Sequence, residues 1–222
     1  DFDSDGTLDI DAQTSPASLG YALSAWMQDS PTAEPLFIYL VDHGGVGSLW
    51  LSDINHDGMA SEDELLQAQA FSTALAALGS ERHLSLLVEA CKSGSFVESL
   101  SAPGRVVLTS TGFENATIAL DGTISFSYYW LLSLLQGDTV LEAFVSAREA
   151  IRAISAQEPQ LDDDGDGVSN GSFDGEVAAL THIGFPFTNR SGTFAEDFVV
   201  IPESGGTSLG IGERALLQAR VA

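Results

Sequence analysis

Cysteine, positive charge and long apolar runs are all scarce in this sequence. A single cysteine among 222 residues cannot form a disulfide within the chain, so cysteine content indicates neither an oxidising nor a reducing compartment. Only 8 lysines and arginines oppose 32 aspartates and glutamates, and the net charge of -24 repels nucleic acid and anionic lipid surfaces. The longest apolar stretches, such as 36–41 and 126–135, are too short to span a bilayer. We therefore expect no nucleic-acid partner and no transmembrane segment.

Hydrophobic residues make up 44% of the chain, enough for a sizeable core. Many of the acids occur in clusters punctuated by glycine and asparagine, a pattern typical of cation ligation, and calcium is the obvious ion. The chain opens on Asp1 within such a cluster, without a starting methionine or a signal-peptide pattern. We therefore interpret the sequence as a fragment of a longer precursor, whose other domains are expected partners.

Alternating strand and helix patterns predict an α/β fold with a parallel sheet. Apolar runs typical of buried strands lie at 36–41, 84–90 and 105–110. Helical patterns lie at 17–28, 61–79 and 139–156. The second of these helices is predicted to begin with Ser61 and Glu64 as a capping box and to end at Gly79.

His43 and Cys91 each follow one of the predicted buried strands. Neighbouring parallel strands deliver their carboxyl ends to one edge of the sheet, so we expect the imidazole and the thiol to meet there. A thiol needs a nearby base to become a nucleophile at neutral pH, and a histidine meets that need. Glycines at 44, 45 and 94 allow backbone N–H groups to approach a substrate carbonyl as an oxyanion hole.

Each residue of this pair also has a structural interpretation. A lone cysteine in an apolar stretch is usually a small buried hydrophobe, and a lone histidine is usually a satisfied core or loop residue. The pairing at two strand ends favours chemistry over both. Ser93, Ser95 and Asp42 are interpreted as turn or strand-end residues without a catalytic role.

The stretches "YLVDHGG" and "LLVEACKSGSF" resemble the legumain-like family of cysteine peptidases, in the clan of caspases, gingipains and clostripain. The resemblance covers roughly residues 14–185 and includes "PQLDDDGDGVSN", which is similar to a segment of bacterial members. It implies a caspase-like three-layer sandwich, a mostly parallel sheet flanked by helices. It also implies that His43 is the general base and acid, that Cys91 is the nucleophile, and that the N–H groups of Gly44 and Cys91 form the oxyanion hole.

The same resemblance bears on domain organisation. Family members normally begin with another strand and helix, which this chain starts too late to supply, so we expect a peptidase domain over 1–185 that is truncated at its N-terminus. Residues 186–222 have turn and short-strand character and are expected to be a linker and the start of a following β-rich domain.

Substrate contacts are also implied by the resemblance. Glu89 matches a glutamate that lines the primary specificity pocket, although a structural strand-end carboxylate explains it equally well. The stretch "LDGTISFSYYW" is similar to a segment that pairs with the substrate backbone as an extra strand, which makes Ser125 and Phe126 candidate contacts. Asp121 is a candidate second pocket carboxylate, against the alternative of an exposed Asp-Gly turn.

A calcium loop is indicated independently of the peptidase motifs. "DINHDGMASEDE" fills an EF-hand-type pattern, with Gly58 at position 6, Ser61 at position 9 and a carbonyl from position 7. The candidate ligands of this loop are Asp53, Asn55, Asp57, Met59 and Glu64. A capping box explains Ser61 and Glu64 but leaves the Asp-Asn-Asp-Gly spacing unexplained.

Two further acidic clusters fit the calcium pattern less completely. The later one places Asp162, Asp164 and Asp166 in register, but Phe173 stands at position 12 and Asp174 just beyond it. The earlier one, residues 1–12, has an alanine at position 12. Each cluster is either a distorted calcium loop or a solvated turn.

These patterns together predict a calcium-binding cysteine endopeptidase that acts on protein or peptide substrates, located outside the cell or on its surface. Two alternatives stay open. One is a catalytically idle, calcium-stabilised binding module of a large surface protein, and the other is a peptide ligase or transpeptidase that uses the same acyl-enzyme.

Overall fold

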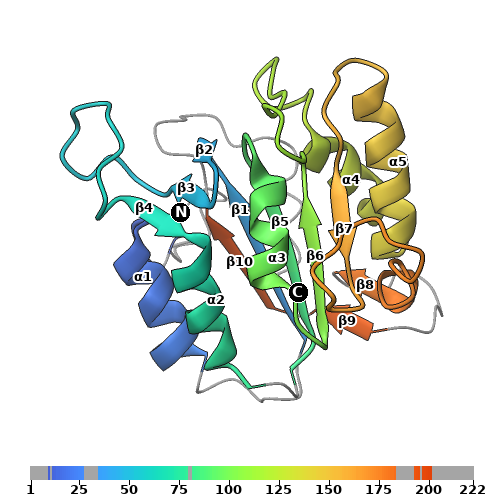
Figure 1. The fold of residues 1–222 in the computed structure, drawn as a ribbon, viewed down its shortest axis with the longest axis horizontal. Helices are drawn as coiled ribbons and strands as arrows, with labels where there is room; N and C mark the ends of the chain where they lie inside the picture. Colours follow the sequence, from blue (N-terminus) through green and yellow to red (C-terminus); the bar gives the residue numbers. More distant parts are fainter. Residues whose placement is uncertain are drawn as a thin grey trace, which may run out of the picture.

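The computed structural model describes residues 10, 12–27, 35–79, 82–183, 193–195 and 197–201. Its centre is a five-stranded sheet in the order β10-β1-β5-β6-β7 (Figure 1). Its strands are β1 (Leu36–Val41), β5 (Leu84–Glu89), β6 (Arg105–Thr109), β7 (Gln160–Asp162) and β10 (Asp197–Ile201). Neighbouring strands from β10 to β6 pair in parallel, whereas β7 is antiparallel to β6. The predicted parallel sheet and its three predicted strands are therefore confirmed.

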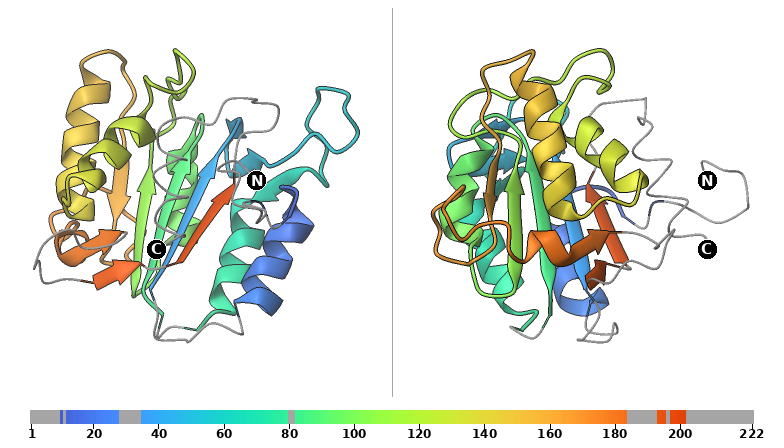
Figure 2. Two further views of the ribbon diagram at one scale, coloured as in Figure 1. Left: turned by 180° about the vertical axis from the view of Figure 1, so that it is seen from behind. Right: turned by 90° about the vertical axis from the view of Figure 1, so that its right-hand side faces the viewer.

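Helices cover both faces of this sheet (Figures 1 and 2). One face carries α1 (Pro16–Tyr21), the π-helix Ala22–Trp26, α2 (Ala68–Ala76) and α3 (Val97–Leu100). The other face carries α4 (Phe126–Leu135) and α5 (Val140–Arg152). The described part of the chain is thus a three-layer α/β sandwich, compatible with the expected caspase-like fold.

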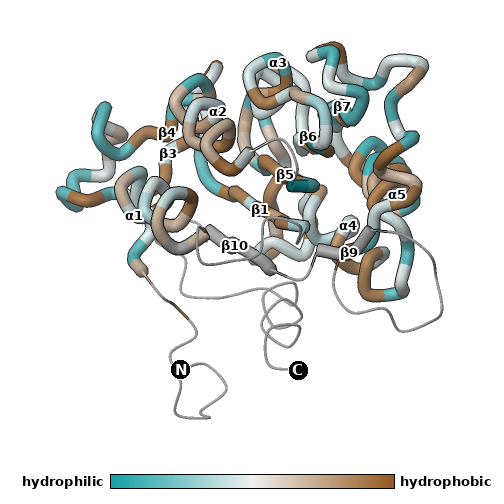
Figure 3. Tube along the Cα trace, turned by 90° about the horizontal axis from the view of Figure 1, so that it is seen from below, coloured by the Kyte–Doolittle hydropathy of each residue, from teal (hydrophilic) through white to brown (hydrophobic). Residues whose placement is uncertain are grey.

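Side-chain alternation in β1 assigns its residues to two separate cores. Leu36, Ile38 and Leu40 pack with α1, α2 and α3, whereas Phe37 and Tyr39 pack with α4 and α5. Because successive side chains of a strand point to opposite faces, a continuous apolar run is required when both faces are covered. Hydrophobic residues of β5 lie in the interior between the two helical layers (Figure 3).

Smaller elements complete the described fold. A three-stranded antiparallel sheet is formed by β2 (Gly44–Gly45), β3 (Ser48–Trp50) and β4 (Leu65–Gln67). Two 3₁₀ turns occur at Ser93–Phe96 and Ala178–Leu180. A further pair of parallel strands consists of β8 (Thr181–Ile183) and β9 (Thr193–Ala195). No described helix combines the length and apolar character needed to cross a bilayer.

The helix predicted over 61–79 is wrong in its first part. Residues 65–67 pair with Ser48–Trp50 as β4, and the helix begins only at Ala68. The Glu64 carboxylate accepts from the Ser61 N–H as in a capping box, but the Glu64 N–H donates to the Ser61 backbone carbonyl and not to its side chain, and a turn follows instead of a helix. A capping box does begin α5, where Thr139 and Glu142 satisfy each other's backbone N–H groups.

Residues 193–195 and 197–201 pair with strands of the same fold. β9 pairs with β8, and β10 borders β1, so these strands extend the sheets of the domain that the sequence analysis ended at residue 185. Residues 202–222 lie outside the described part of the chain.

Candidate active site and cation-binding loops

The ends of β1 and β5 bring His43 and Cys91 to one edge of the central sheet. Val41 and Glu89, the last residues of the two strands, are register partners in the parallel pair. His43 therefore follows its strand by the same two residues as Cys91. The predicted convergence of the two segments is what this register produces.

Gly44 packs directly against the backbone of the cysteine segment. A Cβ atom at Gly44 would lie 2.6 Å from the carbonyl oxygen of Cys91 and 2.7 Å from Cβ of Ala90, closer than real Cβ contacts allow. Such a Cβ would also lie 3.5 Å from the backbone nitrogen of Cys91. The glycine thus permits an approach that holds His43, its neighbour in sequence, beside the cysteine segment.

The His43 side chain is exposed, while its backbone is fixed on both sides. Its N–H donates to Oδ1 of the buried Asp42 at 2.6 Å, and its carbonyl accepts from the Trp50 N–H at 2.9 Å. The His43 and Trp50 rings lie 6.0 Å apart between centroids. The imidazole is therefore reachable from solvent but supported by the strand end and by β3.

The residues after Cys91 turn sharply and are tied to the segment that follows β6. Ser93 is fully buried; its N–H donates to Oγ1 of Thr111 at 3.1 Å, and its Oγ accepts from the Thr111 N–H at 3.2 Å. The Gly94 N–H donates to the carbonyl of Gly112 at 2.9 Å. A Cβ at Gly94 would meet the Gly112 backbone at 2.7 Å, so only glycine fits there. The half-buried Cys91 thus begins a rigidly held turn.

Ser95 joins this turn to the hairpin that carries His43. Its hydroxyl donates to the carbonyl of Lys92 at 2.6 Å and accepts from the Gly47 N–H at 2.8 Å. Sequence analysis gave Ser93 and Ser95 no role in the chemistry, and both prove to position the cysteine segment. Their place in "CKSGSF" was visible, but their partners Thr111 and Gly47 depend on the fold.

A family model described as the Peptidase C13 family matches residues 23–145, which include both strand ends and both motifs. The chain belongs to the peptidase C13 family. Membership confirms the legumain-like resemblance and gives the chain a cysteine-peptidase-type function at the level of the family. The comparison with curated proteins finds no match.

In this C13 chain, Glu89 lies within a buried polar network. Its carboxylate accepts from the Ser127 N–H at 3.2 and 3.3 Å, and Oε2 accepts from the Tyr39 hydroxyl at 3.2 Å. The Tyr39 hydroxyl also lies 2.7 Å from Oγ of Ser127. Burial raises the pKa of Glu89, and the hydrogen bonds from Ser127 and Tyr39 oppose that rise. These contacts agree with the role of a structural strand-end carboxylate for Glu89. Its role in the specificity pocket stays a prediction.

The three other candidate substrate contacts lie in a turn and at the start of α4. A bridge between Ala119 and Ile124 closes the turn that contains the exposed Asp121. Ser125 caps α4 by accepting from the Tyr128 N–H. Phe126 is fully buried and packs on Phe144, so its side chain is directed into the core. The helix begins at Phe126, whereas Ser125 keeps extended backbone angles, and pairing of this stretch with a substrate strand stays a prediction.

The loop between β3 and β4 has the turn geometry expected of its calcium-type pattern and projects from the body of the fold (Figure 1). The N–H groups of Asp57 and Gly58 donate to the two carboxylate oxygens of Asp53. Asn55 Oδ1 also accepts from the Asp57 N–H, and Asp57 Oδ1 accepts from the N–H of Met59, whose side chain is exposed. This loop leads into β4, not directly into the helix as predicted.

Glu64, at position 12 of this loop, is buried, and both of its carboxylate oxygens accept hydrogen bonds from residues of the same loop. One carboxylate oxygen accepts from the N–H groups of Ile54 and Asn55, and the other accepts from the N–H and hydroxyl of Ser61. These hydrogen bonds, those of Ser61 above all, lower the pKa of Glu64 to about 2. The carboxylate is thus held as an anion at the base of the loop.

The later acidic cluster lies at the far edge of the sheet, where β7 ends. Asp162, Asp164 and Asp166 each place a carboxylate oxygen within 4.8 Å of the others. Asp163, between them, points elsewhere and accepts from the N–H groups of Gly175, Val177 and Ala178. Three carboxylates at this spacing form a candidate site for a cation.

Asp174 lies at the back of the same loop. It accepts from the N–H groups of Asp163 and Gly171, and burial, with smaller contributions from Asp162 and Asp164, raises its pKa. Its oxygens are thus directed at backbone donors. The first acidic cluster lies almost entirely outside the described residues.

Proposed function

We propose that the chain is a cysteine endopeptidase in which Cys91 is the nucleophile and His43 is first the general base and then the general acid. The observation that carries this proposal is the contact of Gly44 with the backbone of Cys91, at register-matched strand ends. Membership of the C13 family supports peptide or protein substrates.

The reaction consists of acylation followed by hydrolysis. Sγ of Cys91 attacks the carbonyl carbon of the scissile peptide bond while His43 takes the thiol proton. As the C–N bond breaks, His43 returns that proton to the leaving amine, and a thioester remains on Cys91. Water then attacks the thioester and gives a proton to His43, and the departing sulfur receives it as the C–S bond breaks. The N–H groups of Gly44 and Cys91 are the proposed oxyanion donors, because they belong to contacting segments.

Calcium is the cation we propose for the acidic loops. Carboxylate and carbonyl oxygens are the ligands that this ion prefers, and Asp162, Asp164 and Asp166 supply three carboxylates. In the other loop the candidate ligands are Asp53, Asn55, Asp57 and the Met59 carbonyl, with Glu64 below them. Modest loops of this kind suit extracellular calcium concentrations, which supports the proposed location outside the cell or on its surface.

Cleavage of a mixed fluorogenic peptide library, with and without calcium, tests the peptidase. Wild type is expected to cleave, whereas Cys91→Ala and His43→Ala are expected to lose cleavage with an unchanged far-ultraviolet circular dichroism spectrum. Equal cleavage by wild type and Cys91→Ala would contradict the proposal. Product analysis by mass spectrometry in the presence of an acceptor amine separates hydrolysis from ligation.

The competing function is a catalytically idle, calcium-stabilised binding module. Labelling by a thiol-reactive peptide probe distinguishes it, because an idle module has no need of an activated thiolate. Fast labelling that is lost in His43→Ala supports the peptidase. Labelling at the rate of a free cysteine in both proteins would favour the module.

A further inference from the structure

The carboxylate of Asp162 leaves one buried oxygen without a hydrogen-bond partner. Asp162 is fully buried at the end of β7, where it is the register partner of Val107. Its Oδ2 accepts from the Gly167 N–H at 2.8 Å, whereas its Oδ1 has no partner although it is shielded from solvent. A buried carboxylate oxygen without a donor is costly, and the nearby Asp164 and Asp166 add like charges. A bound cation would remove both penalties.

The loop of residues 53–64 lacks this feature. Both oxygens of Asp53 accept backbone N–H groups, and both oxygens of the buried Glu64 are taken by donors of the loop itself. This loop can therefore close without a cation. In the loop that begins at Asp162, by contrast, one buried carboxylate oxygen has no hydrogen-bond partner.

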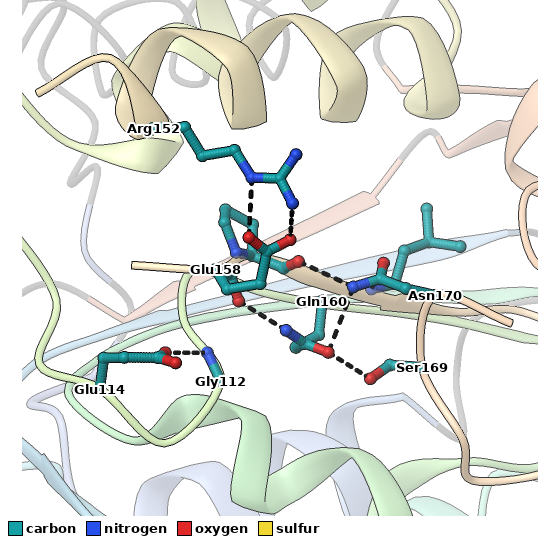
Figure 4. Close-up of polar contacts among 9 residues, drawn as sticks. Gly112, Glu114, Arg152, Glu158, Gln160, Ser169 and Asn170 are labelled. Atoms are coloured by element: carbon teal, nitrogen blue, oxygen red, sulfur yellow. Dashed lines mark hydrogen bonds and ion pairs between the residues drawn. The ribbon is translucent and has the colours of Figure 1, made fainter. Parts of the chain in front are cut away.

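The base of the Asp162 loop is hydrogen-bonded to β7 and to the residue just before it (Figure 4). Asn170 donates from its N–H to the Leu161 carbonyl at 2.7 Å and from Nδ2 to the Pro159 carbonyl at 3.1 Å. The Ser169 hydroxyl donates to Oε1 of Gln160 at 2.5 Å, and Nε2 of Gln160 donates to the Glu158 carbonyl at 2.6 Å. The loop thereby fixes the Gln160 side chain.

Gln160 in turn lies beside the segment that holds the cysteine turn. A Cβ at Gly112 would be 3.5 Å from Nε2 of Gln160, and the Gly112 N–H donates to Oε2 of Glu114 at 2.8 Å (Figure 4). The carbonyls of Gly112 and Glu114 accept the N–H groups of Gly94 and Lys92. Contacts thus connect the Asp162 loop, through Gln160 and Gly112, to the residues that follow Cys91.

A second contact reaches the same region from the other side of the loop. A Cβ at Gly165 would lie 2.8 Å from the carbonyl carbon of Ala102, in the turn after α3. A Cβ at Gly167 would lie 3.6 Å from Cα of Glu98, within α3. Since α3 continues directly from the 3₁₀ turn after Cys91, the loop supports the cysteine segment at both of its ends.

We propose that a divalent cation held by Asp162, Asp164 and Asp166 orders the Cys91 segment, so that the reactivity of the thiol depends on this loop and not on residues 53–64. Calcium is the ion we expect. This inference rests on the proposed function in one respect, that the ordered segment carries the catalytic cysteine.

Asp166→Asn and Asp57→Asn form a matched pair for the test. Both residues are exposed at position 5 of their loops, and each Oδ1 accepts an N–H, from Val168 and Met59 respectively, which an asparagine can retain. Glu176→Gln, at an exposed acid outside the cluster, controls for the loss of one negative charge. Each protein is compared in calcium and in chelator by thermal melting and by the rate of Cys91 alkylation with iodoacetamide.

In wild type and Glu176→Gln, calcium is expected to raise Tm and to change the alkylation rate. Asp166→Asn is expected to lose the alkylation response, whereas Asp57→Asn is expected to keep it. A full response in Asp166→Asn, or loss of the response in Asp57→Asn alone, would overturn the proposal. A response to calcium in alkylation without cleavage of any library peptide would refute the peptidase and leave the cation coupling standing.

Discussion

Among single residues, Gly44 is tightly constrained by the geometry of the candidate active site. Its backbone touches that of Cys91, and the sequence alone indicated a useful glycine there without revealing the contact. The place of His43, Cys91 and Gly44 at the ends of β1 and β5 was predictable, because strand ends and motifs are local patterns. Tyr39, Ser127 and Thr111 were not, because their polar partners come from other elements.

Gly44→Ala is expected to abolish most cleavage, because the new Cβ would collide with the Cys91 carbonyl and push the histidine and cysteine segments apart. Overpacking of this kind costs about 1–3 kcal/mol of unfolding free energy. The measurements are kcat/KM and urea denaturation. Gly20→Ala in α1 is the control, since a Cβ there meets nothing within 4 Å and improves helix propensity. Wild-type cleavage by Gly44→Ala would contradict the geometry.

Glu64 is expected to make stability depend on acid pH. Its folded pKa of about 2 lies below the ordinary value of 4.5, so the unfolded chain binds the proton first as pH falls. The stabilisation is therefore complete above pH 4.5 and disappears as pH falls toward 2. Urea denaturation in chelator should show wild type more stable than Glu64→Gln at neutral pH, with the difference shrinking across this window. Glu62→Gln, at an exposed neighbour, is the control, and a difference independent of pH would refute the assignment.

At the scale of elements, the buried strands were predicted well and the segments around them less well. β1, β5 and β6 are apolar runs that only burial on both faces explains. The helix expected from residue 61 failed at Leu65–Gln67, where pairing with β3 overrides local helical propensity. The sequence analysis named no helix at Phe126–Leu135, where apolar side chains pack against α5 as α4.

The hairpin of β2 and β3 is held to the cysteine turn through Ser95, so Ser95→Ala should loosen two elements at once. The Gly47 N–H loses its acceptor, and kcat/KM is expected to fall roughly tenfold, the equivalent of about 1.4 kcal/mol. Ser133→Ala is the matched control, because it removes a comparable hydrogen bond, to Asp138, within the helical layer. An equal loss of kcat/KM in both variants would show that Ser95 acts only on stability. The readouts are steady-state kinetics and Tm.

At the scale of the whole molecule, acidic charge is the dominant physical property. A net charge of -24 favours expansion of the chain through self-repulsion, and each acidic loop adds to it locally. The sequence established this property fully, because it follows from composition. It could not reveal that residues 193–195 and 197–201 return to the sheets, since such pairings are set by the assembled fold.

Salt is therefore expected to stabilise the calcium-free protein. Raising NaCl from about 0.01 M to about 0.15 M shortens the Debye length from roughly 30 Å to roughly 8 Å and weakens the repulsion. Tm in chelator should rise over this range, and the rise should be smaller in saturating calcium because bound cations already neutralise part of the charge. A Tm that falls with added salt would contradict this account.

The pairing of β1 with β10 has a consequence for folding during synthesis. One neighbour of β1 is β5, which follows β1 after the small sheet and α2. The other neighbour is β10, the last described strand of the chain. Among the described residues, that side of β1 pairs with Asp197–Ile201, which leaves the ribosome long after β1 during synthesis from the N-terminus. Contacts so distant in sequence form slowly, and an open, apolar strand edge invites pairing with other chains. We therefore expect docking of β10 to lower the tendency of the newly made chain to aggregate.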